Sequence, residues 1–238
     1  MYKRIILKLS GETLAPETLE GAQSPTFDAL RVEEVACVIS ELAGMGVQVG
    51  VVMGGGNIWR GRFSEKMDPV NADQMGMLAT VINALAVEDA LRRLGRKATV
   101  FTAQEMNRFS RLYNAKDAIA CLENGEIVLL AGGTGNPFFT TDTGAALRAA
   151  ELKADAVFKG TTVEGVYDSD PRKNPNAQLI RDISYREAVT RGLRVMDLTA
   201  FMLCMEQKVP EVRVFSMENL GNILRVAAGE DLGTTVHE

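Results

Sequence analysis

Short apolar runs alternate along this chain with longer segments in which apolar residues recur every three or four positions. The short runs predict strands at 4–9, 48–53, 98–102, 127–131 and 156–159. Their apolar character is nearly continuous rather than alternating, which is typical of strands covered on both faces of a parallel sheet.

The longer segments predict helices at 30–44, 73–94, 114–123 and 143–153. In the second of them, the spacing places Met75, Leu78, Ile82 and Leu85 on one face. Because these side chains are apolar, we expect that face to turn inward.

The second half of the chain begins past a polar, proline-containing tract at 168–176, which predicts a loop. Beyond it we predict helices at 185–191, 199–208 and 219–228 and a strand at 212–215. The alternation of strands and helices predicts an α/β sandwich on a mainly parallel open sheet. We expect a single domain over residues 1–238, with two lobes on one continuous sheet, about 1–153 and 154–238.

Charge and histidine content exclude several classes of protein. The formal net charge of −5 argues against nucleic-acid binding, which usually needs a basic surface. The single histidine, His237, is the penultimate residue, so a Ser-His-Asp or histidine–metal mechanism inside the fold has no histidine to use. An anionic ligand must therefore be held by a few local cations and backbone N–H groups.

The cysteines and apolar runs bear on location. Cys37, Cys121 and Cys204 are widely spaced in apolar sequence with no C-x-x-C pair, which predicts buried, reduced thiols. Lys8 interrupts the first apolar run, so no signal peptide is predicted, and no stretch approaches the ~18 apolar residues of a membrane span. We expect a cytoplasmic protein without a membrane partner.

Glycine-rich turns follow the predicted strands at their carboxyl ends, where open α/β sheets bind ligands. The first is Lys8-Leu9-Ser10-Gly11, in which Lys8 and Ser10 lie on one side and Gly11 permits close backbone approach. A lysine there can reach the phosphates of a nucleotide. The alternative is an edge lysine before a turn.

The second turn, Gly54-Gly55-Gly56, exposes successive N–H groups that can hold an anion, and Arg60 can add a bidentate phosphate contact. It is neither a Walker A loop nor a G-x-G-x-x-G fingerprint. A purely structural turn is the alternative.

Two further turns follow the later strands. The run 132–143 enters a helix with the hydroxyls of Thr140 and Thr141 at its N-terminus, a natural anion site, although Thr141 or Asp142 can also serve as the N-cap. After the fifth strand, Lys159 is a second strand-end cation and Tyr167 can stack on a base, with a plain β-hairpin as the alternative.

Together these segments resemble the bacterial UMP kinases of the amino-acid-kinase family, over nearly the whole chain. The most specific pieces are Met-Gly-Met-Leu-Ala-Thr at 75–80, the run from Gly133 to Asp142, and Arg-Val-Met-Asp at 194–197. The resemblance implies a three-layer αβα sandwich and transfer of the γ-phosphoryl group of ATP to UMP in pyrimidine biosynthesis. It also implies Mg²⁺ carried with the nucleotide, an acceptor lobe before an ATP lobe, and a homohexamer to which the helix at 78–94 contributes contacts.

The resemblance also implies roles for individual residues. The ATP-binding residues would be Lys8, Leu9, Ser10, Gly11, Gly56, Arg60, Thr161, Tyr167 and Asp170. The UMP-binding residues would be Gly55, Asp73, Thr134, Gly135, Asn136, Pro137, Phe138, Phe139, Thr140 and Thr141. Within this set Asp73 would bond the ribose hydroxyls, and Thr134 and Asn136 would read the uracil. The catalytic residues would be Lys8, Arg60, Asp142 and Lys159, with Asp142 orienting the two lysines.

Departures from the family pattern leave some points open. Thr162 and Glu164 stand where many members have lysine and aspartate, and 16–28 does not match the stretch linked to GTP activation. Control by GTP or UTP is therefore open. Two other functions remain possible. One is a kinase for an amino acid or carbamate, which Asp73 and the run at 134–141 disfavour because they suit a nucleotide acceptor. The other is a nucleotide-binding protein that stores oxoanions, which the set of Lys8, Asp142 and Lys159 disfavours.

Overall fold

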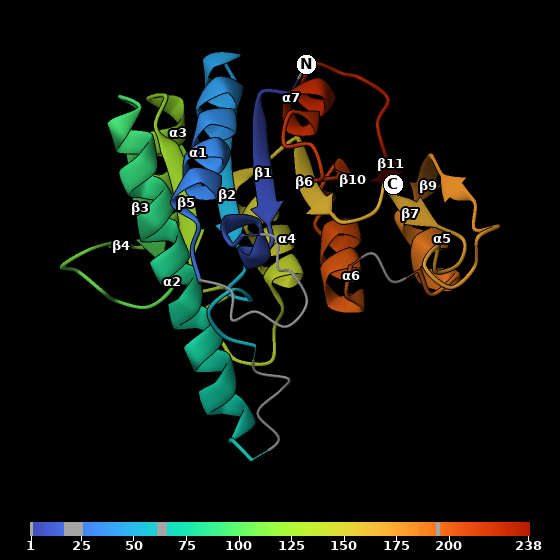
Figure 1. The fold of residues 1–238 in the computed structure, drawn as a ribbon, viewed down its shortest axis with the longest axis horizontal. Coiled ribbons are helices and arrows are strands. Elements are labelled where there is room, and N and C mark those ends of the chain that lie inside the picture. Colours follow the sequence, from blue (N-terminus) through green and yellow to red (C-terminus); the bar gives the residue numbers. More distant parts are fainter. Residues whose placement is uncertain (1, 17–25, 61–65, 194–195) are drawn as a thin grey trace.

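One large mixed sheet runs through the computed structural model, which describes residues 2–16, 26–60, 66–193 and 196–238 (Figure 1). Its strands are β1 (Arg4–Leu9), β2 (Gln48–Met53), β3 (Ala98–Thr102), β4 (Arg111–Leu112), β5 (Ile127–Ala131), β6 (Ala156–Thr161), β9 (Asp182–Ser184), β10 (Glu211–Ser216) and β11 (Thr234–His237). Their order is β4-β3-β5-β2-β1-β6-β10-β11-β9. Every neighbouring pair is parallel except β10 and β11.

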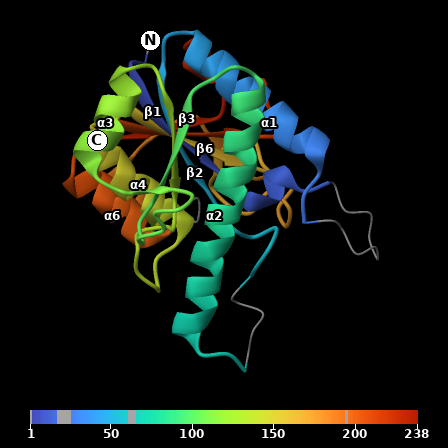
Figure 2. The ribbon, with the colours of Figure 1, turned by 90° about the vertical axis from the view of Figure 1, so that its left-hand side faces the viewer.

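Helices cover both faces of this sheet, as the apolar strands require. On one face lie α1 (Ala29–Gly44), α2 (Pro69–Arg93) and α7 (Asn222–Ala227), and on the other lie α3 (Ala115–Glu123), α4 (Thr141–Leu152), α5 (Tyr185–Thr190) and α6 (Leu198–Glu206). Figure 2 shows α1 and α2 on one side of the strands and α3, α4 and α6 on the other. The predicted αβα sandwich on a mainly parallel sheet is confirmed.

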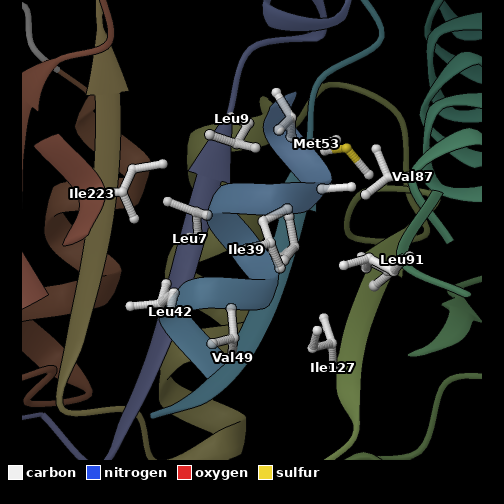
Figure 3. Close-up of a cluster of buried hydrophobic side chains, with 14 of the residues drawn as sticks. Leu7, Leu9, Ile39, Leu42, Val49, Met53, Val87, Leu91, Ile127 and Ile223 are labelled. Carbon is white, nitrogen blue, oxygen red and sulfur yellow. The ribbon is translucent and has the colours of Figure 1, made fainter. Parts of the chain in front are cut away.

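The central strand β1 shows why both faces must be covered. Ile5, Ile6 and Leu7 are successive residues and all are 0% exposed, so adjacent side chains enter different halves of the core. Leu7 packs with Ile39 of α1 in the first half (Figure 3). Ile6 belongs to the second half. Strands of this kind give the nearly continuous apolar runs seen in the sequence.

Helix α2 buries a different face from the one predicted. Met75, Leu78 and Ile82 are 39%, 51% and 48% exposed, so the expectation that they turn inward is wrong. The buried face carries mostly small or polar side chains, among them Ala79 and Asn83. Small side chains let the helix approach the glycine loops closely, and its N-terminal half extends past the edge of the sheet (Figure 2).

The sequence pattern does not predict the shortest elements. These are the 3₁₀ turn η1 (Gly11–Leu14), the edge strands β4 and β9, the short strand β11, and the antiparallel pair β7 (Val166–Tyr167) and β8 (Leu179–Ile180). Two to four residues are too few for a periodic signal. In the part of the chain that the structure describes, no helix is long and apolar enough to cross a membrane.

The parallel register brings four strand ends to one edge of the sheet, the lower one in Figure 1. Lys8 of β1 lies opposite Lys159 of β6, and Val52 of β2 lies opposite Leu130 of β5. The loops that follow β1, β2, β5 and β6 therefore meet at this edge, which is where the predicted site residues lie.

Candidate active site

A compact group of three charged side chains lies at this edge. The Lys8 Nζ is 3.0 Å from Asp142 Oδ1, and Lys159 Nζ donates a hydrogen bond to Asp142 Oδ2. The side chains of Lys8, Asp142 and Lys159 are 14%, 15% and 10% exposed. Because two cations share one carboxylate, the group carries a net positive charge. This charge is largely shielded from water, since all three side chains are mostly buried.

The surroundings shift two pKa values in this group. Burial alone would raise the pKa of Asp142, but attraction from Lys8 and then from Lys159 holds it below the ordinary value. Burial lowers the pKa of Lys159, and repulsion from Lys8 lowers it further, against the attraction of Asp142. Asp142 thus stays ionised at neutral pH, and Lys159 loses its proton at a lower pH than a free lysine does.

The N-terminus of α4 presents Asp142 to the two lysines. The N-cap is Thr140, whose hydroxyl accepts from the N–H groups of Asp142 and Thr143 at 3.1 and 3.2 Å, so the predicted cap by Thr141 or Asp142 is wrong. The carboxylate of Asp197 in turn accepts hydrogen bonds from the hydroxyls of Thr140 and Thr143. Asp142 therefore lies in the first turn of a helix whose start is held by the Thr140 cap and by the carboxylate of Asp197.

The glycine loop after β2 packs directly on the loop after β1. The Gly54 N–H donates to the Leu9 carbonyl at 2.9 Å, and a Cβ on Gly11 would lie 2.7 Å from the Gly54 oxygen. Close contact with the neighbouring loop, and not a left-handed backbone conformation, therefore requires glycine at position 11. The side chain of Leu9 is 1% exposed and lies in the core, so this residue can offer a nucleotide only its backbone.

Arg60 closes this loop. Its guanidinium donates to the Gly56 carbonyl at 3.1 Å and pairs with Glu12 of η1. The Arg60 side chain is 44% exposed. An anion that approached the loop could therefore exchange places with Glu12 at the guanidinium.

A cavity of about 270 Å³, which we call the smaller cavity, opens between α2, the glycine loop and the loop after β5. The residues of the predicted UMP set that line it are Gly55, Asp73, Asn136, Phe139, Thr140 and Thr141. Gly56 and Arg60, predicted on the ATP side, line the same cavity, as does Trp59, which the sequence does not single out. The smaller cavity thus gathers residues predicted for both nucleotides.

The remaining predicted UMP residues lie around the smaller cavity rather than on its wall. Gly135 and Pro137 line a neighbouring cavity of about 360 Å³ on the other side of their loop. Phe138 has a positive φ of 71° and is 71% exposed, and its N–H donates to Asp73 at 2.7 Å. Thr134 caps its own turn, because its hydroxyl accepts from the Asn136 N–H at 3.3 Å.

A second, larger cavity of about 550 Å³ follows β6. Thr161, Tyr167 and Asp170 of the predicted ATP set line it, together with residues of the 168–176 loop. β7 and β8 pair as an antiparallel hairpin, which is the alternative considered for this segment, while stacking of Tyr167 on a base stays a prediction. Arg172 spans part of this larger cavity and donates to the Thr162 hydroxyl at 2.7 Å.

The structure brings the three charged groups and both cavities to one edge, but Lys8, Ser10 and Gly11 line neither cavity. Arg194 and Val195, which belong to the family-like segment at 194–197, lie outside the described residues, as do 17–25 of the 16–28 stretch. Two α2 residues to which the sequence assigns no role also hydrogen-bond to these loops: Thr80, the last residue of the family-like segment at 75–80, and Asn83. The motif at 75–80 marks the position of Thr80 but not its role, and a polar residue such as Asn83 inside a helical pattern gives no sign of facing a loop.

Comparison with known proteins agrees with this geometry. The amino acid kinase family model matches residues 3–216. A uridylate kinase of Bacteroides thetaiotaomicron is 52% identical over 238 residues, which is 99% of this chain and 98% of that protein. One of Porphyromonas gingivalis is 50% identical over 237 residues, 99% of this chain and 97% of that protein.

Solved structures give the same result. UMP kinase from Bacillus anthracis matches with a TM-score of 0.93 at 35% identity, over 99% of this chain and 96% of that one. UMP kinase from Ureaplasma parvum matches with a TM-score of 0.91 at 35% identity, over the full length of both chains.

Proposed function

This chain belongs to the amino acid kinase family, and we propose that it transfers the γ-phosphoryl group of ATP to UMP, forming ADP and UDP for pyrimidine nucleotide synthesis. It is a nucleoside monophosphate kinase. The observation that carries the proposal is the placement of the charged group between two cavities. Thr141, next to Asp142, lines the smaller cavity, and Thr161, two residues past Lys159, lines the larger one.

We assign UMP to the smaller cavity. Asp73 reaches it from α2 and would accept hydrogen bonds from the ribose hydroxyls, while Asn136, with Thr134 beside it, would read the uracil. The N-terminus of α4 at Thr140 and Thr141 and the N–H groups of Gly55 and Gly56 favour a phosphate between them. These residues belong to 1–153, which would be the acceptor lobe.

We assign the base and ribose of ATP to the larger cavity, in the lobe at 154–238. Tyr167 offers a ring for stacking and Asp170 a carboxylate for the ribose. The triphosphate would then run toward Lys8 and the N–H groups of Ser10 and Gly11. Arg60 would bind phosphate after it leaves Glu12.

Catalysis would rest on positioning and electrostatics. A phosphate oxygen of UMP is already ionised, so the reaction needs neither a general base nor a covalent enzyme intermediate. Charge spreads over the transferring group and the β–γ bridge during the reaction, and Lys8 and Lys159 would stabilise it from fixed positions. Asp142 holds both ammonium groups in place and offsets their repulsion.

Mg²⁺ would enter with the nucleotide. Among the described residues, no three His, Cys, Asp or Glu side chains lie close enough to hold a metal ion, and the Asp142 carboxylate is paired with two lysines. The phosphate oxygens would therefore be the main ligands, and the ion would offset charge on them.

We also propose a cytoplasmic location, because the three cysteines are free thiols and thiols stay reduced in the cytosol. We further propose that the protein assembles as a homohexamer.

A coupled assay of ADP release tests the proposal. With ATP as donor, UMP should be the best acceptor, ahead of dUMP and far ahead of CMP, because polar groups left unpaired by the wrong base are costly. Acetylglutamate and carbamate should give no release above background. Release with acetylglutamate but not with UMP would reject the proposal in favour of a carboxylate kinase, and nucleotide binding without release would favour a storage protein.

A further inference from the structure

Two buried polar side chains of α2 hydrogen-bond to the glycine loops that follow β2 and β5. Thr80 and Asn83 are three residues apart, so they lie on the same face of the helix. They are 6% and 0% exposed. Neither touches the other loop in the hydrogen bonds that the described residues make, so each loop has its own anchor.

Asn83 holds the loop that follows β2. Its Nδ2 donates to the Gly54 carbonyl at 2.7 Å and to Asn57 Oδ1 at 2.8 Å, and Asn57 Nδ2 donates back to Asn83 Oδ1 at 3.0 Å. Asn83 thus contacts both ends of the glycine run, Gly54 through its carbonyl and Asn57 through a reciprocal pair of amide hydrogen bonds. With its carbonyl turned toward Asn83 and its N–H toward Leu9, Gly54 has both backbone groups fixed, and this sets the direction of the next two N–H groups.

Thr80 holds the loop that follows β5. Its hydroxyl accepts from the Gly132 N–H at 2.8 Å and donates to the Met77 carbonyl at 2.6 Å. Gly132 has a φ of 78°, so the loop leaves its strand in a conformation that a side chain would strain. Thr80 fixes the residue at which this turn begins.

The two loops are neighbours in the sheet. Val52 pairs with Leu130, so Gly54 and Gly132 each stand two residues past a paired position. We infer that Thr80 and Asn83 are positioning residues that set the two halves of the site separately: Asn83 aligns the phosphate-side loop at 54–60, and Thr80 aligns the base-reading loop at 132–138. This inference rests on the proposed assignment of UMP to the smaller cavity.

The inference predicts different losses from matched substitutions. Asn83→Ala removes all three hydrogen bonds between this side chain and the phosphate-side loop and should lower kcat by ~10- to 100-fold, because a displacement of about 1 Å at the reacting groups has effects of that size. The ratio of kcat/KM for UMP to that for CMP should stay within about twofold of the parent value. Thr80→Val keeps the shape of the side chain but loses the hydroxyl, and it should lower that ratio by about tenfold or more while changing kcat for UMP less than Asn83→Ala does.

Two further variants keep the test decisive. Thr80→Ser restores the hydroxyl and should restore discrimination between UMP and CMP. If Asn83→Ala does not fold, Asn57→Ala keeps the bond from Asn83 to Gly54 but removes the reciprocal amide pair and the bond from Asn57 Nδ2 to the Thr26 carbonyl. It should lower kcat by about three- to tenfold with the parent ratio intact.

Thermal melts separate these roles from loss of folding. Variants that lower kcat and the UMP-to-CMP ratio in the same proportion, or that lower only the melting temperature, would overturn the inference. So would wild-type kcat in Asn57→Ala when Asn83→Ala is unfolded. A parent enzyme that does not prefer UMP would instead reject the proposed function, whatever the variants do.

Discussion

The two cavities at the active edge are built in different ways. The smaller cavity is bounded by a long helix and two glycine loops, and those loops are tied to buried polar groups on α2. The larger cavity is bounded mainly by exposed loop residues around the β7–β8 hairpin, and its cross-links are between exposed side chains, such as Arg172 to Thr162. Buried hydrogen bonds fix geometry more strongly than exposed ones, because a broken buried bond leaves a polar group unpaired. We therefore expect the smaller cavity to discriminate between nucleotides, and the larger cavity to tolerate substitutions of its side chains.

The largest expected effect concerns the charged group between the cavities. Lys8→Met should lower kcat by ~10² to 10³, since one preorganised electrostatic partner of the transition state is lost. KM should rise less than kcat falls. Lys3→Met, at the exposed opposite end of β1, is the matched control and should retain wild-type kcat.

Calorimetry on the Lys8→Met variant sharpens the comparison. UMP affinity should change little, because the walls of the smaller cavity remain. A folded variant with wild-type kcat would return Lys8 to an ordinary strand-end lysine.

The next effect lies within the smaller cavity. Asp73→Ala removes an ionised acceptor and should weaken UMP binding by ~10- to 100-fold, since hydrogen bonds to charged groups are worth about 1.5 to 3 kcal/mol. The gap between UMP and dUMP should narrow while ATP affinity stays nearly unchanged. Asp89→Ala, on an exposed part of the same helix, serves as the control. Equal losses for ATP and UMP would show that the two cavities are not separate sites.

A smaller effect concerns pH. Burial and then Lys8 lower the pKa of Lys159 below its ordinary 10.5, so this side chain loses its proton at a lower pH than a free lysine. The kcat should therefore begin to fall on the alkaline side below pH 10.5. An arginine stays charged, so Lys159→Arg should move that decline to higher pH, with a lower plateau because the guanidinium is wider.

The exposed Lys97→Arg variant provides the pH control and should leave the profile in place. An unchanged alkaline limb in Lys159→Arg would assign that limb to another group.

The smallest effect is expected in the larger cavity. Arg172 is exposed and bonds to a hydroxyl, so Arg172→Ala should change KM for ATP by no more than about threefold and leave kcat and UMP affinity unchanged. Arg186→Ala, exposed on α5 and away from the cavity wall, is the comparison. A loss of tenfold or more in KM for ATP would contradict the view that this cavity is tolerant.

The sequence predicts the frame of the molecule well for a physical reason. Strands buried on both faces leave an unmistakable apolar run, as in Ile5, Ile6 and Leu7. It predicts the wrong buried face for α2, because Met75 and Leu78 are more hydrophobic than the alanines on the opposite face, and a hydrophobicity pattern assigns the more hydrophobic face to the core. The buried face needs small residues to approach the loops, and hydrophobic periodicity does not report that need.

For the site, the sequence predicts which reactive side chains stand at strand ends, but it does not predict which of them lie opposite each other in the sheet. That Lys8 and Lys159 stand opposite each other depends on the pairing of β1 with β6, although the two lysines are separated by about 150 positions in the chain. The resemblance supplies Asp142 as their partner, and the three side chains do lie together in the structure. The sequence does not predict the roles of Thr80, although it lies in the family-like segment at 75–80, or of Asn83, because a polar residue in a helix ordinarily faces solvent.

A crystal structure of the enzyme with UMP and a non-hydrolysable ATP analogue tests the central claim most directly. The account predicts UMP in the smaller cavity with its ribose on Asp73, the adenine in the larger cavity near Tyr167, and the γ-phosphoryl analogue within hydrogen-bond distance of Lys8 and Lys159. UMP in the larger cavity, or a γ-phosphoryl group that contacts neither lysine, would contradict it.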